Sequence, residues 1–215
     1  MVTAKIVLDP GHGGSGTVGF SDGNHAVSPS GVLEKNLTLA MAELVKVELE
    51  GVAASDGHAL TILMTRSDDT NLGLSARANV ARDNRADRFL SIHFNAFDGV
   101  ARGVETYVRR AQDNINLAAD RRFAGIIQSA VFNTIRGVDS RTRDRGVKEA
   151  KFGVLNDTAL GNLSGGQCRA CLLEVEFLDV GAVDLLFNTG PNAGNVRQQI
   201  ARAIANGILT DLLHP

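Results

Sequence analysis

The pattern of hydrophobic and polar positions divides the chain into short apolar runs and longer stretches with helical spacing. Runs rich in Ile, Val, Leu and Phe that stop at Gly, Pro, Asp or charged residues are typical of buried strands. Six strands are predicted in this way, at 5–8, 60–65, 88–94, 104–108, 152–155 and 171–177. The stretch 139–148 is dense in Arg and Asp and is predicted to be a solvated charged loop, with a clamp for an anionic substrate as the alternative.

Helical spacing, with apolar residues three and four positions apart, occurs between the predicted strands. It predicts helices from Leu33 to Leu49, from Asn114 to about Ile135 and from about Val196 to Leu213, and a shorter helix from a Ser75 cap through Arg82. The segment 16–31 has no apolar period and is predicted to be a surface loop, in which His25 is exposed rather than a metal ligand. Strands that alternate with helices predict an α/β fold, a three-layer sandwich with a mostly parallel central sheet of about six strands flanked by helices.

Composition and charge narrow the class of protein. The 215 residues, with 23 glycines and no linker-like tract, suit one domain over 1–215 with a buried core. The net charge of −2 gives no basic field, so we expect no nucleic-acid partner. We also expect a monomer. No apolar run approaches the ~20 residues of a membrane span, and no charged segment with an apolar one after it precedes the first strand. We therefore expect neither a membrane span nor a signal peptide.

The two cysteines, Cys168 and Cys171, form a C-x-x-C pair. Such a pair can be redox-active or half of a zinc site, but the first requires a helix start and the second requires another pair. Here the pair leads into a predicted strand, where side chains three residues apart point to opposite faces. The sequence therefore predicts two inert thiols, at least one of them buried.

Two predicted strands each deliver a histidine near their end. His12 follows the strand 5–8 after an Asp-Pro-Gly turn, and His93 lies near the end of the strand 88–94. Ligands of open α/β sheets bind outside the strand ends, and Glu34 stands in the first turn of the helix between these strands. Interaction with the helix dipole would account for Glu34 but not for the two histidines. Two imidazoles and one carboxylate, with a fourth position left to water, are a ligand set of catalytic zinc.

Glu174 and Glu176 interrupt the apolar strand 171–177. A carboxylate in a buried strand costs several kcal/mol unless it is paired or takes part in chemistry. The period of two places both on one face of the strand unless a bulge intervenes. We expect one of them, Glu174, to face the metal ligands.

The chain resembles the zinc-dependent N-acetylmuramoyl-L-alanine amidases of the amidase-3 type, which are catalytic domains of bacterial cell-wall amidases and of some endolysins. The matching stretches recur in family order from residue 5 to about residue 210. They are Val7–Gly14, Gly31–Leu37, Thr65–Arg66, Leu74, Arg77–Asn79, Ala86–Ala96, Arg102–Glu105, Arg145–Lys148, Gly153–Leu155 and Leu172–Val175.

This resemblance implies one zinc ion per chain, bound by His12, Glu34 and His93, with Glu174 as the catalytic acid and base. It implies peptidoglycan as the substrate, in the periplasm or outside the cell, and cleavage of the amide between the lactyl group of N-acetylmuramic acid and the L-alanine of the stem peptide. Glu174 would take a proton from water activated by zinc and return it to the departing amine. The family usually has a small residue in place of Glu176, which leaves open a share of the catalytic role for this second carboxylate.

Other assignments stay open on sequence grounds. Asp9 either orients an imidazole or stabilises its Asp-Pro-Gly turn, and Asn95 either contacts substrate or bonds its own loop. A zinc peptidase acting on cell-wall peptides would use the same ligands, whereas a non-catalytic peptidoglycan-binding module would lack a base such as Glu174. A nucleotide site is disfavoured, because Gly11–Gly14 fails the G-x-G-x-x-G spacing.

The interval between the second histidine and the catalytic glutamate bears on regulation. Members of the resembled family that need an activator carry an added helical segment there, which covers the zinc. Here the interval holds one long predicted helix whose continuous apolar stripe suits packing on the sheet. We therefore expect a catalytic domain that is active without a partner.

Overall fold

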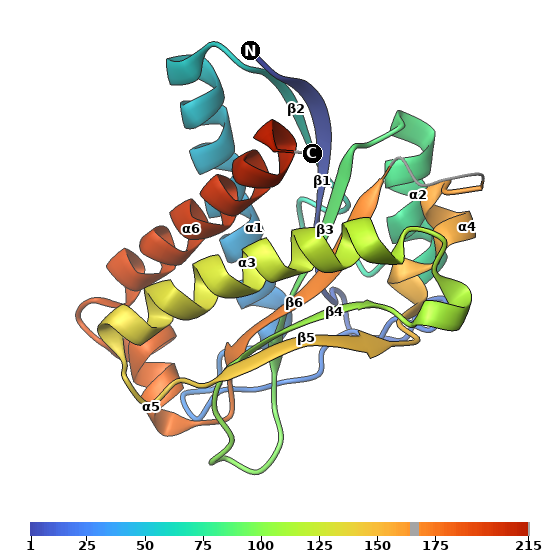
Figure 1. Cartoon of the computed structure of the whole chain (residues 1–215). Coiled ribbons are helices and arrows are strands. Elements are labelled where there is room, and N and C mark those ends of the chain that lie inside the picture. The colour runs from blue at the N-terminus through green and yellow to red at the C-terminus, as the bar shows by residue number, and fades with distance from the viewer. Residues whose placement is uncertain (164–167, 215) are drawn as a thin grey trace.

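One six-stranded sheet lies at the centre of the computed structural model, which describes residues 1–163 and 168–214 (Figure 1). The strands are β1 (Thr3–Pro10), β2 (Ala59–Met64), β3 (Arg88–Asn95), β4 (Val104–Arg109), β5 (Asp144–Ala150) and β6 (Arg169–Phe177). Their order is β2-β1-β3-β6-β4-β5. The first four in this order are parallel, β4 is antiparallel to β6, and β5 is parallel to β4. The predicted mostly parallel sheet is confirmed.

Helices cover both faces of this sheet, as the predicted three-layer sandwich requires (Figure 1). One face carries α1 (Glu34–Asp56), α3 (Leu117–Val138) and α6 (Ala193–Leu213). The other carries α2 (Leu74–Asn84), the 3₁₀ turn η2 (Gly153–Leu155) and α4 (Asp157–Leu160). The remaining short elements are η1 (Ala111–Asp113), α5 (Gly181–Asp184) and the π-helical turn η3 (Leu185–Thr189).

Alternation along the strands builds a separate core on each face. In β1, Ile6 and Leu8 pack into the larger core beneath α1, α3 and α6, whereas Val7 packs into the smaller core beneath α2 and α4. The two cysteines follow the same rule, since Cys171 lies in the larger core and Cys168 in the smaller one. Both thiols are buried and free, and burial raises the pKa of each, which fits the prediction of inert side chains.

The edge strand beside β4 was predicted in the wrong place. The apolar run 152–155 is not a strand but contains η2, and the strand β5 begins instead inside the predicted charged loop and ends two residues beyond it. An edge strand needs no continuous apolar run, because only one side of it pairs and much of it meets solvent. Backbone pairing with β4 therefore decides the structure of β5, whose Val147 alone packs against the larger core.

Three helix starts differ from the prediction. Gly73 rather than Ser75 precedes the first turn of α2, because the Leu74 N–H donates to the loop oxygen of Gly19 and so fixes where the helix begins. The helix α3 begins at Leu117 rather than Asn114, after the turn η1, and α6 begins three residues before the predicted start. Helix ends depend on such nonlocal contacts more than helix interiors do.

The topology brings three strand ends and one helix start to the same edge. The carboxyl ends of β1, β3 and β6 are neighbours in the sheet, and α1 begins beside them. No helix among residues 1–163 and 168–214 combines the length and apolar character of a membrane span.

Candidate functional site

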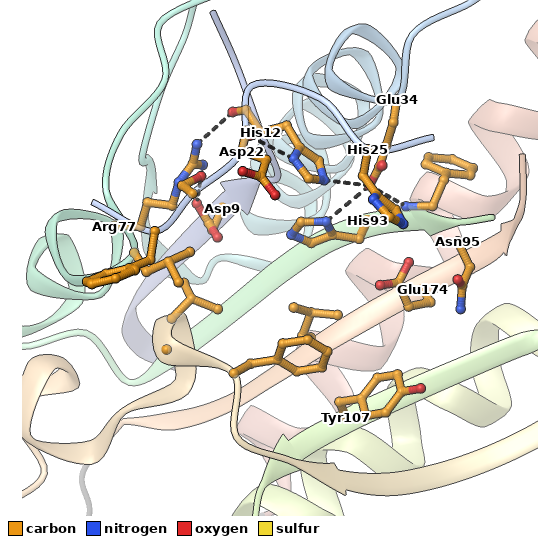
Figure 2. A pocket seen from close by; sticks show the side chains of 18 residues that line it. Asp9, His12, Asp22, His25, Glu34, Arg77, His93, Asn95, Tyr107 and Glu174 are labelled. Atoms are coloured by element: carbon orange, nitrogen blue, oxygen red, sulfur yellow. Dashed lines mark hydrogen bonds and ion pairs between the residues drawn. The ribbon is translucent and has the colours of Figure 1, made fainter. Parts of the chain in front are cut away.

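His12, Glu34 and His93 converge on one point at this edge, as Figure 2 shows. Glu34 Oε1 lies 3.2 Å from His12 Nε2 and 3.1 Å from His93 Nδ1. One ligand atom from each residue lies within 4.8 Å of the others, so the group can hold a metal ion. The three side chains come from the turn after β1, the start of α1 and the strand β3.

The turn after β1 places His12 in a conformation that few residues adopt. His12 has a φ of 61°, in the left-handed region, and such strain is characteristic of functional sites. Its Nδ1–H donates to the backbone oxygen of Asp22 over 2.9 Å, which leaves Nε2 with a free lone pair. Gly11 is required here, because a Cβ atom would stand 2.2 Å from the ring of His93.

Glu34 is fixed by backbone donors as well as by the two imidazoles. Its Oε2 accepts from the N–H of Ala26 and its Oε1 from the N–H of Phe94. The side chain is only 1% exposed, and burial alone would raise its pKa, but the contacts with His12 and His93 lower that pKa below its ordinary value. The cluster therefore holds an ionised carboxylate between two imidazoles.

Asp9 contacts no imidazole, which corrects one of the two roles considered for it. Its oxygens accept from Thr65 Oγ1, Ser91 Oγ and Arg77 Nη1 at 2.6, 2.6 and 3.0 Å. Although burial would raise the pKa of Asp9, the nearby Arg77 guanidinium and the hydrogen bonds lower it. Arg77, itself 1% exposed, donates in turn to the backbone oxygen of His12 over 2.6 Å. Asp9 thus supports the histidine turn through a guanidinium that the sequence analysis had not singled out.

A β-bulge separates the two glutamates of β6. His93 is the register partner of Glu174, but two residues further along β3 the partner is Phe177, so β6 contains one extra residue. Glu174 lines the cavity beside the three donors, and Figure 2 shows its carboxylate facing them. Glu176 is fully buried and accepts from Arg102 Nε and the N–H of Gly103. Of the two carboxylates, that of Glu174 faces the cluster of His12, Glu34 and His93.

Glu174 lacks the partners that a buried carboxylate needs. Its Oε2 is buried and has no hydrogen-bond partner within the described residues. Burial raises the pKa of this carboxyl well above its ordinary value, and the negative charges of Glu34 and Glu105 raise it further. An unpaired carboxyl with a perturbed pKa beside a group of metal donors is characteristic of an active site.

Asn95 bonds its own surroundings, the second of the roles considered for it. Its Nδ2 donates to Glu105 Oε1 over 2.6 Å, and its Oδ1 accepts from the N–H of Ala96. Glu105, the register partner of Glu174, also accepts from Tyr107, Arg145 and Lys148. Glu105 lies in one of the stretches that match the family, but no role was predicted for it. Its position opposite Glu174 depends on the antiparallel pairing of β4 with β6, which no local pattern reveals.

A cavity of about 370 Å³ is lined by His12, Glu34, His93, Asn95 and Glu174, among others. His25 is exposed, as predicted, and is absent from the metal-binding group, but its ring stacks on His12 with 6.4 Å between ring centroids. The apolar part of the lining comes from the α2 and η2 side and from β6. It includes Leu74, Phe152, Val154 and Leu172, and Phe20 and Phe94 add apolar side chains from the turn after β1 and from β3.

The three donors fit zinc in type and in spacing. A tetrahedral zinc ion with ligands at about 2.0–2.2 Å holds its ligand atoms about 3.3–3.6 Å apart. The two separations from Glu34 Oε1, 3.1 and 3.2 Å, are close to that range. Three donors that converge from separate elements, each fixed by a further hydrogen bond or by packing, are typical of a preorganised metal site.

Comparisons with known proteins identify the family. The family model described as N-acetylmuramoyl-L-alanine amidase matches residues 6–210. The N-acetylmuramoyl-L-alanine amidase CwlM of Bacillus licheniformis is 32% identical over 95% of this chain and 67% of the relative. The uncharacterized protein YqiI of Bacillus subtilis is 34% identical over 94% of this chain and 82% of the relative.

Solved structures agree with this assignment. The crystal structure of an N-acetylmuramoyl-L-alanine amidase from Clostridium difficile 630 aligns with a TM-score of 0.74 and 27% identity, over 98% of this chain and 97% of that one. The catalytic domain of the amidase CwlV from Bacillus (Paenibacillus) polymyxa aligns with a TM-score of 0.72 and 28% identity, over 97% of each chain. The chain therefore belongs to the N-acetylmuramoyl-L-alanine amidase family and is an amidase of peptidoglycan.

Proposed function

We propose that the chain binds one zinc ion through His12 Nε2, Glu34 Oε1 and His93 Nδ1, and that Glu174 is the catalytic acid and base. Zinc held by these donors supplies a Lewis acid that polarises a carbonyl and lowers the pKa of water towards ~7. Three protein donors leave one position of a tetrahedral site open, as in catalytic zinc sites. The bond cut is the amide between the lactyl group of N-acetylmuramic acid and L-alanine.

The unpaired Oε2 of Glu174 is the observation that carries this proposal. As a base, the Glu174 carboxylate takes the proton of the attacking water, and as an acid it passes the proton to the nitrogen of the departing L-alanine. The raised pKa of the carboxyl makes its ionised form a stronger base for the first step. Glu176 takes no part, since its oxygens are occupied by Arg102 and Gly103.

The other residues of the site position these groups. The ring of His12 donates to the backbone oxygen of Asp22, and its backbone oxygen accepts from Arg77. The N–H groups of Ala26 and Phe94 donate to the Glu34 carboxylate. Such contacts keep the donors aligned before metal binds, which lowers the cost of binding it.

The working unit is a monomer in which residues 1–215 form one catalytic domain acting on the cell wall, in the periplasm or outside the cell. In support of one domain, both cores pack on one sheet. The family match over residues 6–210 favours a substrate in the wall rather than a cytoplasmic one.

Two measurements test the proposal. Elemental analysis of the purified chain should find about one zinc per chain, and His12→Ala or His93→Ala should abolish its retention. Mass spectrometry of digested peptidoglycan should find stem peptides with a free L-alanine amino terminus and glycan strands that keep their lactyl groups. A peptidase would release a different peptide end, and a binding module would release nothing; either result would reject the proposed reaction.

A further inference from the structure

Phe20 stands in solvent at the site, in a backbone conformation that disfavours it. Its side chain is 92% exposed although it lines the same cavity as the metal donors and Glu174. Its φ is 67°, in the left-handed region that a residue with a Cβ seldom adopts. Both features cost free energy in the absence of a ligand, and a bulky residue under backbone strain is an indication of function.

The backbone around Phe20 holds the ring in this position. Val18 and Ser21 exchange two hydrogen bonds of 2.9 Å, and the φ values of Gly19 and Phe20 are both positive, which defines a type I′ turn. Such turns favour Gly at the second central position, where this chain has Phe20.

The turn is anchored to the rest of the site. The Asn71 amide donates to the backbone oxygens of Gly16 and Ser21, and its Oδ1 accepts from Arg77, the residue that also holds His12. Gly19 lies so close to Gly73 that a Cβ atom on it would stand 2.9 Å from the Gly73 Cα. The backbone that carries the ring is therefore fixed relative to the metal donors.

We propose that Phe20 binds the glycan strand by stacking its ring on an N-acetylated hexosamine next to the scissile amide. This inference rests on the proposed function, in which the acyl side of that amide is a lactyl group attached to a sugar ring. A sugar must therefore lie near the metal donors. The axial C–H groups on one face of a hexosamine ring make it apolar, and an exposed, rigid aromatic ring is a suitable platform for such a face.

The charges in the site favour the glycan over the peptide as the partner of Phe20. Ionised groups that suit the charged stem peptide gather beside Glu174, where Glu105 pairs with Arg145 and Lys148. Phe20 instead belongs to the turn of residues 18–21, which comes after His12 in the chain. Asn71 hydrogen-bonds to this turn and Gly73 packs against it. An amide between the two groups of residues would direct its sugar towards Phe20 and its peptide towards Glu105.

The test compares Phe20→Asn with Phe20→Trp and with Phe97→Asn. Asn tolerates the left-handed conformation, so Phe20→Asn removes the ring without adding backbone strain. Trp keeps a stacking surface. Phe97 is 80% exposed and does not line the cavity, which makes Phe97→Asn the matched control. The probe is chitotetraose, an oligomer of N-acetylglucosamine without a stem peptide, titrated into zinc-loaded protein and followed by NMR.

We expect Phe20→Asn to weaken chitotetraose binding ~10-fold, because burial of a Phe ring is lost, while its thermal midpoint does not fall. Phe20→Trp and Phe97→Asn should bind like the wild type. In hydrolysis, Phe20→Asn should lose ~10-fold in kcat/KM on a disaccharide peptide, through KM, and nothing on a lactyl peptide that lacks the sugar ring.

Equal saccharide binding by wild type and Phe20→Asn would overturn the proposal, as would an equal loss in Phe97→Asn or an equal loss on both hydrolysis substrates. A lower thermal midpoint in Phe20→Asn would assign the ring a structural role instead. The titration is independent of turnover. If the wild type hydrolysed neither substrate, the proposed function would fail, yet the titration would still decide whether Phe20 binds sugar.

Discussion

At the scale of single residues, the environments of Glu174 and Glu176 indicate a catalytic role for the first and a structural role for the second. Replacing Glu174 by Gln keeps the size of the side chain and removes the basic carboxylate, so we expect kcat to fall ~10²-fold or more with zinc retained. Glu176→Gln should leave kcat nearly unchanged and lower stability, because it weakens a buried pair with Arg102. Release of stem peptides with a free L-alanine amino terminus, zinc content and urea unfolding measure these effects. The reverse pattern of activities would assign the base to Glu176.

Arg77 gives a second prediction at this scale. Arg77→Met leaves the buried Asp9 carboxylate without its cation, and breaking a buried pair in this way costs about 3–5 kcal/mol of the free energy of unfolding. The control is Arg82→Met on the same helix. The Arg82 side chain is half exposed and pairs with the exposed Asp83. That change should cost less than about 1 kcal/mol. Urea unfolding of both variants checks the difference; equal losses would mean that Arg77 does not support the histidine turn.

Single residues also show where sequence patterns are informative. His12, Glu34 and His93 were predictable as a group because strand ends and helix starts meet at one edge of a parallel sheet. The pairing of Asp9 with Arg77 was not predictable. Arg77 lies 68 residues further along the chain, and packing sets the direction of its side chain. The separation of Glu174 from Glu176 depends on a bulge, which the alternation of side chains in β6 does not encode.

At the scale of elements, Asp120 couples the first turn of α3 to the start of β6. Its Oδ1 accepts from the N–H of Ala170, and its Oδ2 accepts from Asn114. Burial raises the pKa of Asp120 to about 7, against an ordinary value of 3.8. Between these two pH values the folded protein keeps a proton that the unfolded chain has released. The contribution of Asp120 to stability is therefore complete below about pH 4 and is lost as the pH rises to about 7.

Asp120→Asn cannot titrate and should remove this pH dependence. We expect the free energy of unfolding of the wild type, relative to that of Asp120→Asn, to fall by on the order of 2–4 kcal/mol between pH 4 and pH 8. Urea unfolding of both proteins in the same metal-free buffer measures the difference, since titration of the histidines then cancels. Parallel pH profiles for the two proteins would show that Asp120 keeps an ordinary pKa.

Helices and strands were predictable where burial in a core gives their sequence a regular spacing of apolar residues. The strands β1, β3 and β6 and the interiors of α1, α3 and α6 pack into the cores and were found from their apolar positions. The strand β5 was missed because it lies at the sheet edge, where pairing with β4 and not burial defines it. The run 152–155 was taken for a strand because its apolar side chains, buried beneath α2, are equally compatible with the turn η2.

At the scale of the whole molecule, the layered architecture determines whether the site is open. The long helix α3 packs with α6 over the face of the larger core, and its apolar stripe is buried there. The cavity is lined instead by the turn after β1, by β3, β4 and β6, and by residues of α2 and η2. Neither α3 nor α4, the two α-helices between His93 and Glu174 in the described part of the chain, contributes a residue to the lining of the cavity.

The purified, zinc-loaded chain should therefore release dye from labelled peptidoglycan without an activator protein. A helix that must leave the site before substrate enters would cost free energy that a partner has to supply, and α3 cannot leave without exposing its buried residues, such as Phe123 and Ile127. The rate should be unchanged when an extract of partner proteins is added, whereas removal of zinc with a chelator should abolish release and readdition should restore it. An inactive zinc-loaded chain that gained activity on deletion of part of 110–144 would show instead that this segment closes the cavity in solution.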